Sequence, residues 1–340
     1  MGYSSQTGKA IFRTQSSPGV VQTDFADEGV IMKLRSGSLA PQREVLTADP
    51  EIGGGRDVTD AYLSTVAHSG DYEFYLRTRS FTSLLRACLG SATSEAGTDA
   101  EAGVHTHTFA ASDASALPIL TIGESLSDNF AHFVYQDAVV NTIHLESDAA
   151  GFVQGTAGVI AKRGESVDAT DLDGTAEWDD GVMFVGTNAT VTYNGVTLPA
   201  KSFSLDVNNN FEDDDYRLGS FYLGDLTPKR REITSSFSIR PEDSSLWKQA
   251  VWGSSGATSA SGATTKAPLV ITIDSYEQIA STGIVEQVKF EFPNFALSPF
   301  TIDVSGDDII ETDLEGNALR PKANVSAITA TVRNGVAEIA

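Results

Sequence analysis

Runs in which apolar and polar residues alternate recur along the whole chain, and they constrain its fold more than any other feature. The clearest stand at residues 71–78 (DYEFYLRT), 139–147 (VVNTIHLES), 202–207 (SFSLDV), 235–240 (SSFSIR) and 288–292 (VKFEF). A period of two is typical of β-strands that bury one face and leave the other in water. The chain is therefore predicted to be mainly β.

Helical periodicity is clear in two places. Residues 81–89 and residues 242–252 each place their apolar side chains on one stripe. Each segment is followed by a glycine, Gly90 and Gly253, the residue that most easily adopts the left-handed conformation of a helix C-cap. Two short helices with glycine caps are predicted.

The two helices stand in the same local order, which suggests an internal repeat. Each follows a strand and leads into a loop rich in small residues, at 91–117 and 254–267, and then into strands that begin near Pro118 and Pro268. We interpret this order as a tandem duplication, although any two antiparallel β domains could share it. The predicted division is a first β domain with an N-terminal arm, an acidic linker or loop, and a second β domain, at residues 1–164, 165–180 and 181–340.

The charge of the chain excludes some functions. Acids outnumber bases by 46 to 23, for a net charge of −23, whereas a protein that grips nucleic acid needs lysines and arginines to neutralise phosphates. Cys88 is the single cysteine, so neither an intrachain disulfide nor a cysteine-based zinc site can form. Apolar stretches are too short to cross a bilayer, and no membrane association is expected.

Motifs for catalysis or for cofactor binding are weak. His105 and His107 alternate on an extended segment and could supply two metal ligands, but a plain strand or loop explains them as well. Residues 206–215 resemble a calcium loop, yet Phe211 and Arg217 stand where such a loop needs glycine and glutamate. We expect no enzyme activity, no metal and no cofactor.

Three longer strings carry a family resemblance. They are residues 118–125 (PILTIGES), 134–163 (VYQDAVVNTIHLESDAAGFVQGTAGVIAKR) and 200–253, and the last contains the more specific YRLGS at 216–220 and PKRRE at 228–232. These strings resemble the tail tube (major tail) proteins of long non-contractile tailed bacteriophages. The resemblance is strongest over residues 84–253 and weaker over nearly the whole chain.

The resemblance implies a fold and an assembly. The fold would consist of tail-tube-type β-sandwich or split-barrel domains, each with a flanking helix. Six such domains usually close one ring, so a duplicated chain would form a ring of three chains, a trimer with pseudo-sixfold symmetry. A hexamer of the full chain is the alternative. Stacked rings would form the hollow tail of the virion, made in the host cytoplasm, through which double-stranded DNA passes without specific binding.

The same resemblance implies partners and leaves a rival function open. The expected partners are further copies of the chain, the tape measure protein, the tail terminator and the tail-tip proteins. The rival is a structural protein that decorates the capsid or forms the tail tip, which would share the β-rich and cysteine-poor composition.

Particular residues are expected to act in this assembly. Glu146, Asp148 and Glu291, polar members of alternating strands, are candidates for the lumen wall, although a solvated outer face would look the same. The basic cluster of Lys229, Arg230 and Arg231 could meet an acidic stretch of a neighbouring subunit, such as Asp213, Asp214 and Asp215, and a solvated turn is the alternative. Further contacts between subunits are expected from the segments 1–19, 41–65, 91–117, 164–180 and 254–267.

Overall fold

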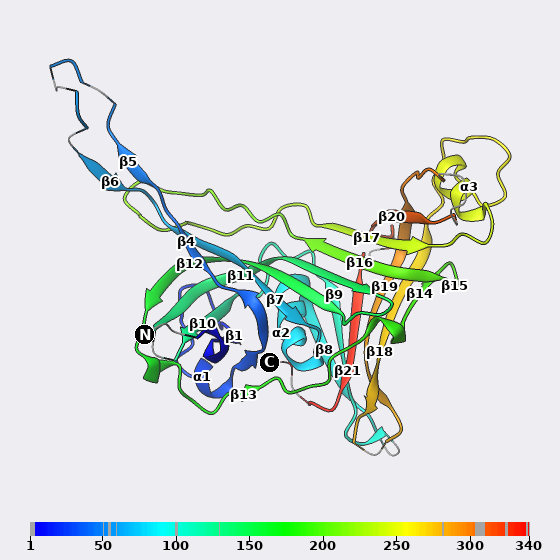
Figure 1. The fold of residues 1–340 in the computed structure, drawn as a ribbon, viewed down its shortest axis with the longest axis horizontal. Helices are drawn as coiled ribbons and strands as arrows, with labels where there is room; N and C mark the ends of the chain where they lie inside the picture. The colour runs from blue at the N-terminus through cyan, green and yellow to red at the C-terminus, as the bar shows by residue number, and fades with distance from the viewer. Residues whose placement is uncertain are drawn as a thin grey trace.

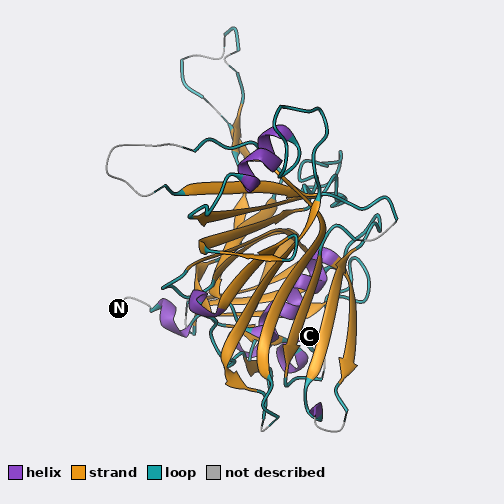
Figure 2. Cartoon of the chain, turned by 90° about the vertical axis from the view of Figure 1, so that its right-hand side faces the viewer, coloured by secondary structure: helices purple, strands orange, loops and turns teal. Residues whose placement is uncertain are grey.

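A computed structural model shows a mainly β chain with a central helix (Figures 1 and 2). It describes residues 4–339 except 50, 54–55, 59, 99–100, 129, 281, 303–309, 324–325 and 338. We refer to residues 1–164 as the first half and to residues 181–340 as the second half. In the part of the chain that is described, no helix is both long and apolar enough to cross a membrane.

In the first half, antiparallel strands follow the order β2-β1-β10-β11-β12-β7, and β3 and β4 share the outer edge of β7. A two-stranded ribbon, β5 and β6, projects from this edge (Figure 1). The elements are η1 (Ser5–Thr7), β1 (Lys9–Thr14), α1 (Phe25–Glu28), β2 (Val30–Met32), β3 (Leu34–Gly37), β4 (Ala40–Gln42), β5 (Val45–Thr47), β6 (Ala61–Leu63), β7 (Ala67–Tyr75), α2 (Thr78–Leu89), β8 (Gly90–Ala96), β9 (His105–Ala111), β10 (Leu120–Ser127), β11 (Ala131–Asp148) and β12 (Gln154–Ser166).

The second half repeats this strand order as β15-β14-β18-β19-β20-β17-β16. A further strand, β21, pairs with β19 beside β20. The elements are η3 (Ala169–Asp171), β13 (Glu177–Trp178), η4 (Gly186–Asn188), β14 (Ala189–Tyr193), β15 (Val196–Leu198), β16 (Ala200–Asn208), β17 (Glu232–Ile239), α3 (Ser245–Trp252), β18 (Ala267–Gln278), β19 (Val285–Leu297), β20 (Thr312–Ala318) and β21 (Thr329–Asn334).

Irregularities in the ladders also recur at matching places. The register between β10 and β11 shifts between Leu120 and Ile122, and that between β18 and β19 shifts between Ala267 and Leu269. A second shift occurs where β3 meets β7 and again where β16 meets β17. Such bulges add a residue to one strand and bend the sheet, so the two halves bend at matching points.

Two antiparallel strand ladders join the two halves. β11 pairs with β16 from Thr142 with Asn208 to Asp148 with Ser202, and β9 pairs with β21. The strands β8 and β9 lie where the sequence predicted a loop at 91–117, and that prediction was wrong for them. Their small residues extend along the open edge of β21, because strand formation depends more on an available neighbour than on composition. The predicted division into two domains, with residues 165–180 between them, stays a prediction.

The acidic stretch packs along the first half. β12 continues to Ser166, and β13 then pairs in parallel with β2. Leu172 is buried with Ile11 and Phe25 in a small apolar cluster. The acidic stretch is thus a loop that packs against the first half.

Both predicted helices are present, with shifted starts. α2 begins at Thr78 rather than at residue 81, and α3 begins at Ser245 rather than at residue 242. Both end at the predicted glycines, since Gly90 and Gly253 each have φ of 91° and donate their N–H to the last turn. The helix C-caps are confirmed.

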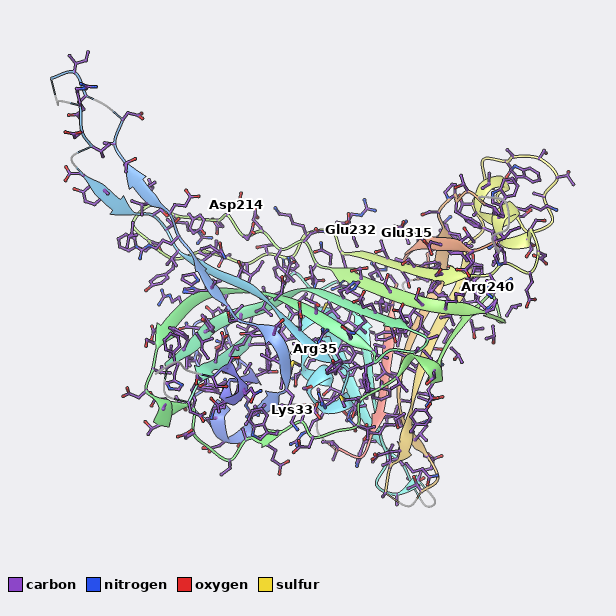
Figure 3. The ribbon with its side chains drawn as sticks, in the orientation of Figure 1. Lys33, Arg35, Asp214, Glu232, Arg240 and Glu315 are labelled. Carbon is purple, nitrogen blue, oxygen red and sulfur yellow. The ribbon has the colours of Figure 1, made fainter. Side chains whose placement is uncertain are left out.

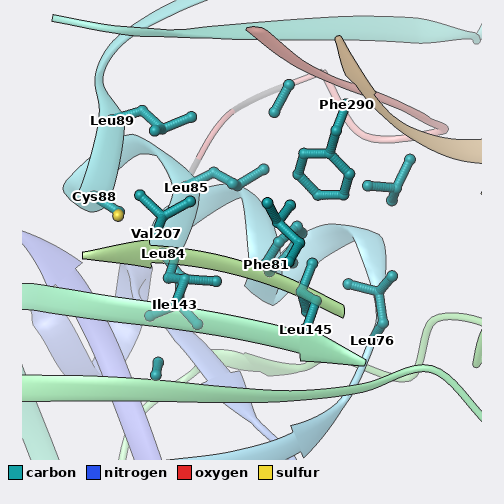
Figure 4. Close-up of a cluster of buried hydrophobic side chains, with 14 of the residues drawn as sticks. Leu76, Phe81, Leu84, Leu85, Cys88, Leu89, Ile143, Leu145, Val207 and Phe290 are labelled. Atoms are coloured by element: carbon teal, nitrogen blue, oxygen red, sulfur yellow. The ribbon is translucent and has the colours of Figure 1, made fainter. Parts of the chain in front are cut away.

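The main core surrounds α2, and side chains of both halves contribute to it (Figure 4). Leu84 and Cys88 of α2 lie near Ile143 of β11 and Val207 of β16, and Phe290 of β19 belongs to the same cluster. All five are at most 4% exposed. Because α2 fills the space between the halves, it holds the joint of β11 and β16 in place.

Candidate lumen wall

One continuous antiparallel sheet crosses the molecule from the first half to the second. Its order is β3 and β4, then β7, β12, β11, β16, β17 and β20 (Figure 1). The joint of β11 and β16 stands in its middle, so each half contributes neighbouring strands to a single surface.

The two faces of this sheet differ because side chains alternate along each strand. One face packs into the core with residues that are at most 5% exposed: Tyr72, Phe74, Ile143, Leu145, Phe203, Leu205, Phe237 and Leu314. The other face is polar and follows the register in rows. One row reads Glu73, Thr156, His144, Asp206, Thr234, Asn317, and the next reads Gln154, Glu146, Ser204, Ser236, Glu315.

Carboxylates dominate the polar face. Two of its basic side chains are Arg35, which bonds to Gln154 and lies over the ring of Tyr75, and His144. Figure 3 shows Glu232 and Glu315 along the second-half part of the sheet. The acids in these and the flanking rows are Asp71, Glu73, Glu146, Asp148, Asp206, Glu232, Asp313 and Glu315. Such a face repels a polyanion at short range.

His144 ties the two halves together on this face. Its Nδ1 lies 2.6 Å from Oδ1 of Asp206 across the joint, and its Nε2 lies 3.5 Å from Oε2 of Glu146. The hydrogen bond with Asp206, aided by the nearby carboxylates, raises the pKa of His144. The ring, when protonated, therefore offsets part of the negative charge at the centre of the sheet.

The structure places two of the three predicted lumen acids on the polar face. Glu146 and Asp148 are exposed there, in adjacent rows. Glu291 lies on the part of β19 that pairs with β18 and β21, and its carboxylate is 2.7 Å from Nζ of Lys289. The sheet brings Glu146 and Asp148 together but not Glu291. Whether any of them lines a lumen stays a prediction.

The predicted contact residues lie in and beside the long connection between β16 and β17. Lys229 pairs with Glu212 at 3.5 Å, Arg230 is exposed, and Arg231 is half-buried with its Nε donating to Asn209. Asp215 pairs with Arg217 at 2.7 Å. Asp213 and Asp214 are exposed (Figure 3 labels Asp214). Their role between subunits also stays a prediction.

Sequence reasoning missed six acids of the polar face, among them Glu232 at the start of β17. Asp71 and Glu73 on β7, Asp206 on β16, and Asp313 and Glu315 on β20 alternate with buried residues in the same way as Glu146 and Asp148. The alternation of buried and polar residues along each strand already indicates these acids, and applying it to every predicted strand would have found them.

The weak ligand motifs have structural roles here. His107 is fully buried, accepts or donates hydrogen bonds with Ser94 at 2.8 Å and Asn334 at 3.1 Å, and burial lowers its pKa. Asn209 of the predicted calcium-like loop points inward and donates to the carbonyls of Cys88 and Val140. Among the residues that the structure describes, no three His, Cys, Asp or Glu side chains gather into a metal-binding group.

Comparison with known proteins agrees with this architecture. Among curated proteins, none matches the chain. The family of phage tail tube proteins matches residues 7–318, which is most of the chain and includes every strand of the continuous sheet. The chain belongs to the phage tail tube protein family.

Proposed function

We propose that the chain polymerises into stacked rings that form a hollow tail tube, and that viral DNA passes through the tube during ejection. Membership of the family makes the protein a component of the tail tube. The continuous sheet with one apolar and one acidic face carries the proposal, because it has the form of a wall segment. The acidic face would line the lumen, and the apolar face packs into the body of the ring.

The repeated strand order supports a tandem duplication and, through it, a ring of three chains with pseudo-sixfold symmetry. Each half supplies four equivalent strand positions: β3 with β4, β7, β12 and β11 in the first half, and β16, β17, β20 and the end of β19 in the second. Six halves would give about 24 strands, and at about 4.8 Å spacing and about 40° tilt the backbone circle is about 50 Å wide. A hexamer of the whole chain is the alternative.

The acidity of the wall would keep DNA moving. A cationic lumen would bind phosphates and stall passage, whereas an acidic one repels them. Screening limits this repulsion to about 8 Å at physiological salt, so it prevents adhesion but does not drive ejection. The tape measure protein, the tail terminator and the tail-tip proteins would be the other partners, and no enzymatic step is required.

Neutralising the wall tests this role. We expect phage that carry Glu146→Gln, Asp148→Asn and Glu315→Gln to assemble tails but to eject DNA more slowly, with the largest difference at low salt. A matched control neutralises three exposed acids away from this face, Glu95→Gln, Glu101→Gln and Glu277→Gln. Equal ejection rates in the two variants at every salt concentration would contradict a role for the acidic face.

Position in the virion separates this function from its rival. Labelled chain along the whole tail, in images of intact particles, supports the tube. Label confined to the capsid or to the tail tip would instead support a decorating or tail-tip protein.

A further inference from the structure

The chain carries two long connections of nearly equal length at matching places in the two halves. Residues 43–66, the first arm, join β4 to β7, and residues 209–231, the second arm, join β16 to β17. Each leaves and re-enters the sheet at paired residues, Gln42 with Ala67 and Asn208 with Glu232. Figure 1 shows the first arm, with β5 and β6, projecting away from the sheet.

The second arm is seated on the first half. The guanidinium of Arg163 lies 4.7 Å from the ring centre of Tyr222, and Lys162 pairs with Asp225 at 3.5 Å. The base of the first arm also touches it, since the N–H of Val66 donates to the carbonyl of Phe221 at 2.7 Å. Two apolar residues of this arm, 7% and 4% exposed, are buried in a cluster with the first-half sheet, and they are Phe211 and Leu223.

The first arm has the composition of a docking segment and is exposed. Val45, Leu46, Tyr62 and Leu63 are between 54% and 70% exposed, which is unusual for four apolar side chains on one ribbon. The described residues of the arm are also acidic, and the exposed acids are Glu44, Asp49, Glu51, Asp57 and Asp60.

The register identifies the place in the second half that corresponds to the seat of the second arm. Ala161 pairs with Ala138 beside the bulge of β11, and Ala318 pairs with Phe295 beside the matching bulge of β19. Two residues further along stand Arg163, which holds the second arm, and Arg320. Arg320 is thus the counterpart of Arg163.

The place of Arg320 in the second half carries several bases. It lies where β17, β18 and the end of β20 come together, and Arg320 itself pairs with Asp113 at 2.5 Å. The exposed bases that just precede β17 and β18 or just follow β20, which we name the second seat, are Lys229, Arg230, Lys266, Arg320 and Lys322. Lys229 and Arg230 also form the end of the second arm, and Lys229 pairs with Glu212 there. In a chain of net charge −23, five bases at the corner that corresponds to an occupied seat form a surface complementary to the acidic first arm.

We propose that the first arm of one copy docks on the second seat of the next copy and so repeats between chains the contact that the second arm makes within the chain. Asp57 and Asp60 precede β7 by the same numbers of residues as Tyr222 and Asp225 precede β17, so they would face Arg320. The inference rests on the proposed ring, for which it supplies the contact. The contact between copies would be more sensitive to salt than the contact of the second arm within the chain, because it would consist mainly of exposed charges.

Crosslinking tests which surfaces meet. In tubes assembled with the tail-tip complex, Asp57→Cys with Arg320→Cys, treated with a short bismaleimide, is expected to give covalent multimers, and each single variant only monomers. Arg163→Cys with Tyr222→Cys is the control that links within one chain. Cys88 does not interfere, because it is buried and its pKa is raised to about 12. Multimers from Asp57→Cys with Arg163→Cys instead would place the arm on a first half and overturn the proposal.

Charge exchange tests the chemistry. Asp57→Lys with Asp60→Lys, or Arg230→Glu with Lys266→Glu and Arg320→Glu, is expected to raise the concentration needed for assembly about tenfold or more. All five changes in one chain should restore assembly, and Glu95→Lys with Glu101→Lys, exposed elsewhere, should leave it unchanged. Unchanged melting temperatures would show that the variants fold.

The outcomes separate this inference from the proposed function. Tubes that form normally with reversed charges, and that give no crosslink between Asp57→Cys and Arg320→Cys, would overturn the arm contact and leave the tube intact. Wild-type chain that stays monomeric with the tail-tip complex would contradict the tube itself.

Discussion

The helices α2 and α3 occupy the same place in the two halves, but their surroundings differ. Ten of the twelve residues of α2 are buried, whereas Gln249 is the one buried residue of α3 and the other seven are half-buried. α2 is covered by the second half, since Phe81 meets the ring of Phe290 at 6.4 Å and Thr78 donates to Glu286. A pocket of about 280 Å³ remains open between α3 and the hairpin of β14 and β15.

This difference suggests how the chain is used. The first half is closed by the half that follows it, and the second half lacks a follower in a single chain. In the ring proposed above, the next copy would supply one, and the joint between chains would resemble the joint of β11 and β16 within the chain.

The cores of the halves differ as well. In the first half, Oε2 of Glu124 accepts hydrogen bonds from Tyr72 at 3.2 Å and from the N–H of Leu39, and Tyr135 lies beside it. The matching register positions of the second half hold Ile271, Phe237 and Phe292, all at most 1% exposed, in an apolar core. The same topology therefore accepts a polar and an apolar interior, and the buried carboxyl of Glu124 makes the core of the first half sensitive to pH.

The largest expected effect compares the two helices directly. Leu84→Ala should lower the free energy of unfolding of the monomer by about 3 to 5 kcal/mol, because the side chain is fully buried and its removal leaves a cavity in the core. The same change at half-buried Leu246 should cost about 1 kcal/mol. Urea unfolding measures both. Equal losses would mean that α3 is packed as tightly as α2 in the single chain.

The next effect concerns pH. Burial raises the pKa of Glu124 to about 7 from an ordinary 4.5, so the folded state favours the protonated form. Its contribution to stability is complete below pH 4.5 and is lost as the pH rises through 7. We expect the free energy of unfolding of the wild type to fall between pH 5 and pH 8 by about 2 to 3 kcal/mol more than that of Glu124→Gln.

A control separates this residue from general charge effects. Glu95→Gln, at an exposed position, should leave the pH dependence unchanged. If the free energy of unfolding of the wild type stays constant between pH 5 and pH 8 and Glu124→Gln behaves the same, the raised pKa of Glu124 is contradicted.

The smallest effect tests the joint between the halves. The pKa of His144 is raised, so its contribution is complete below about pH 6.5 and is lost as the pH rises through the raised value. The side chain is 35% exposed, and solvent screening limits the effect of His144→Gln to less than about 1 kcal/mol at pH 6 and nothing at pH 9. Imidazole titration by NMR measures the shift directly. A value for His144 at or below 6.5 would contradict the bridge.

The sequence was informative about strands and caps but not about partners. The period of two identified most long strands, and Gly90 and Gly253 marked both helix ends. It could not predict that β11 pairs with β16 or that β9 pairs with β21, because alternation tells which face is buried and not which strand lies alongside. Glu291 shows the limit at the candidate site. It alternates as Glu146 does, but β19 changes neighbours along its length.

The number of chains in a ring tests the central claim most directly. A reconstruction of the assembled tube by electron cryomicroscopy should show six similar β units around the lumen that trace as three chains, with the acidic face of the continuous sheet turned inward. Six chains in each ring, or an acidic face turned outward, would contradict the account.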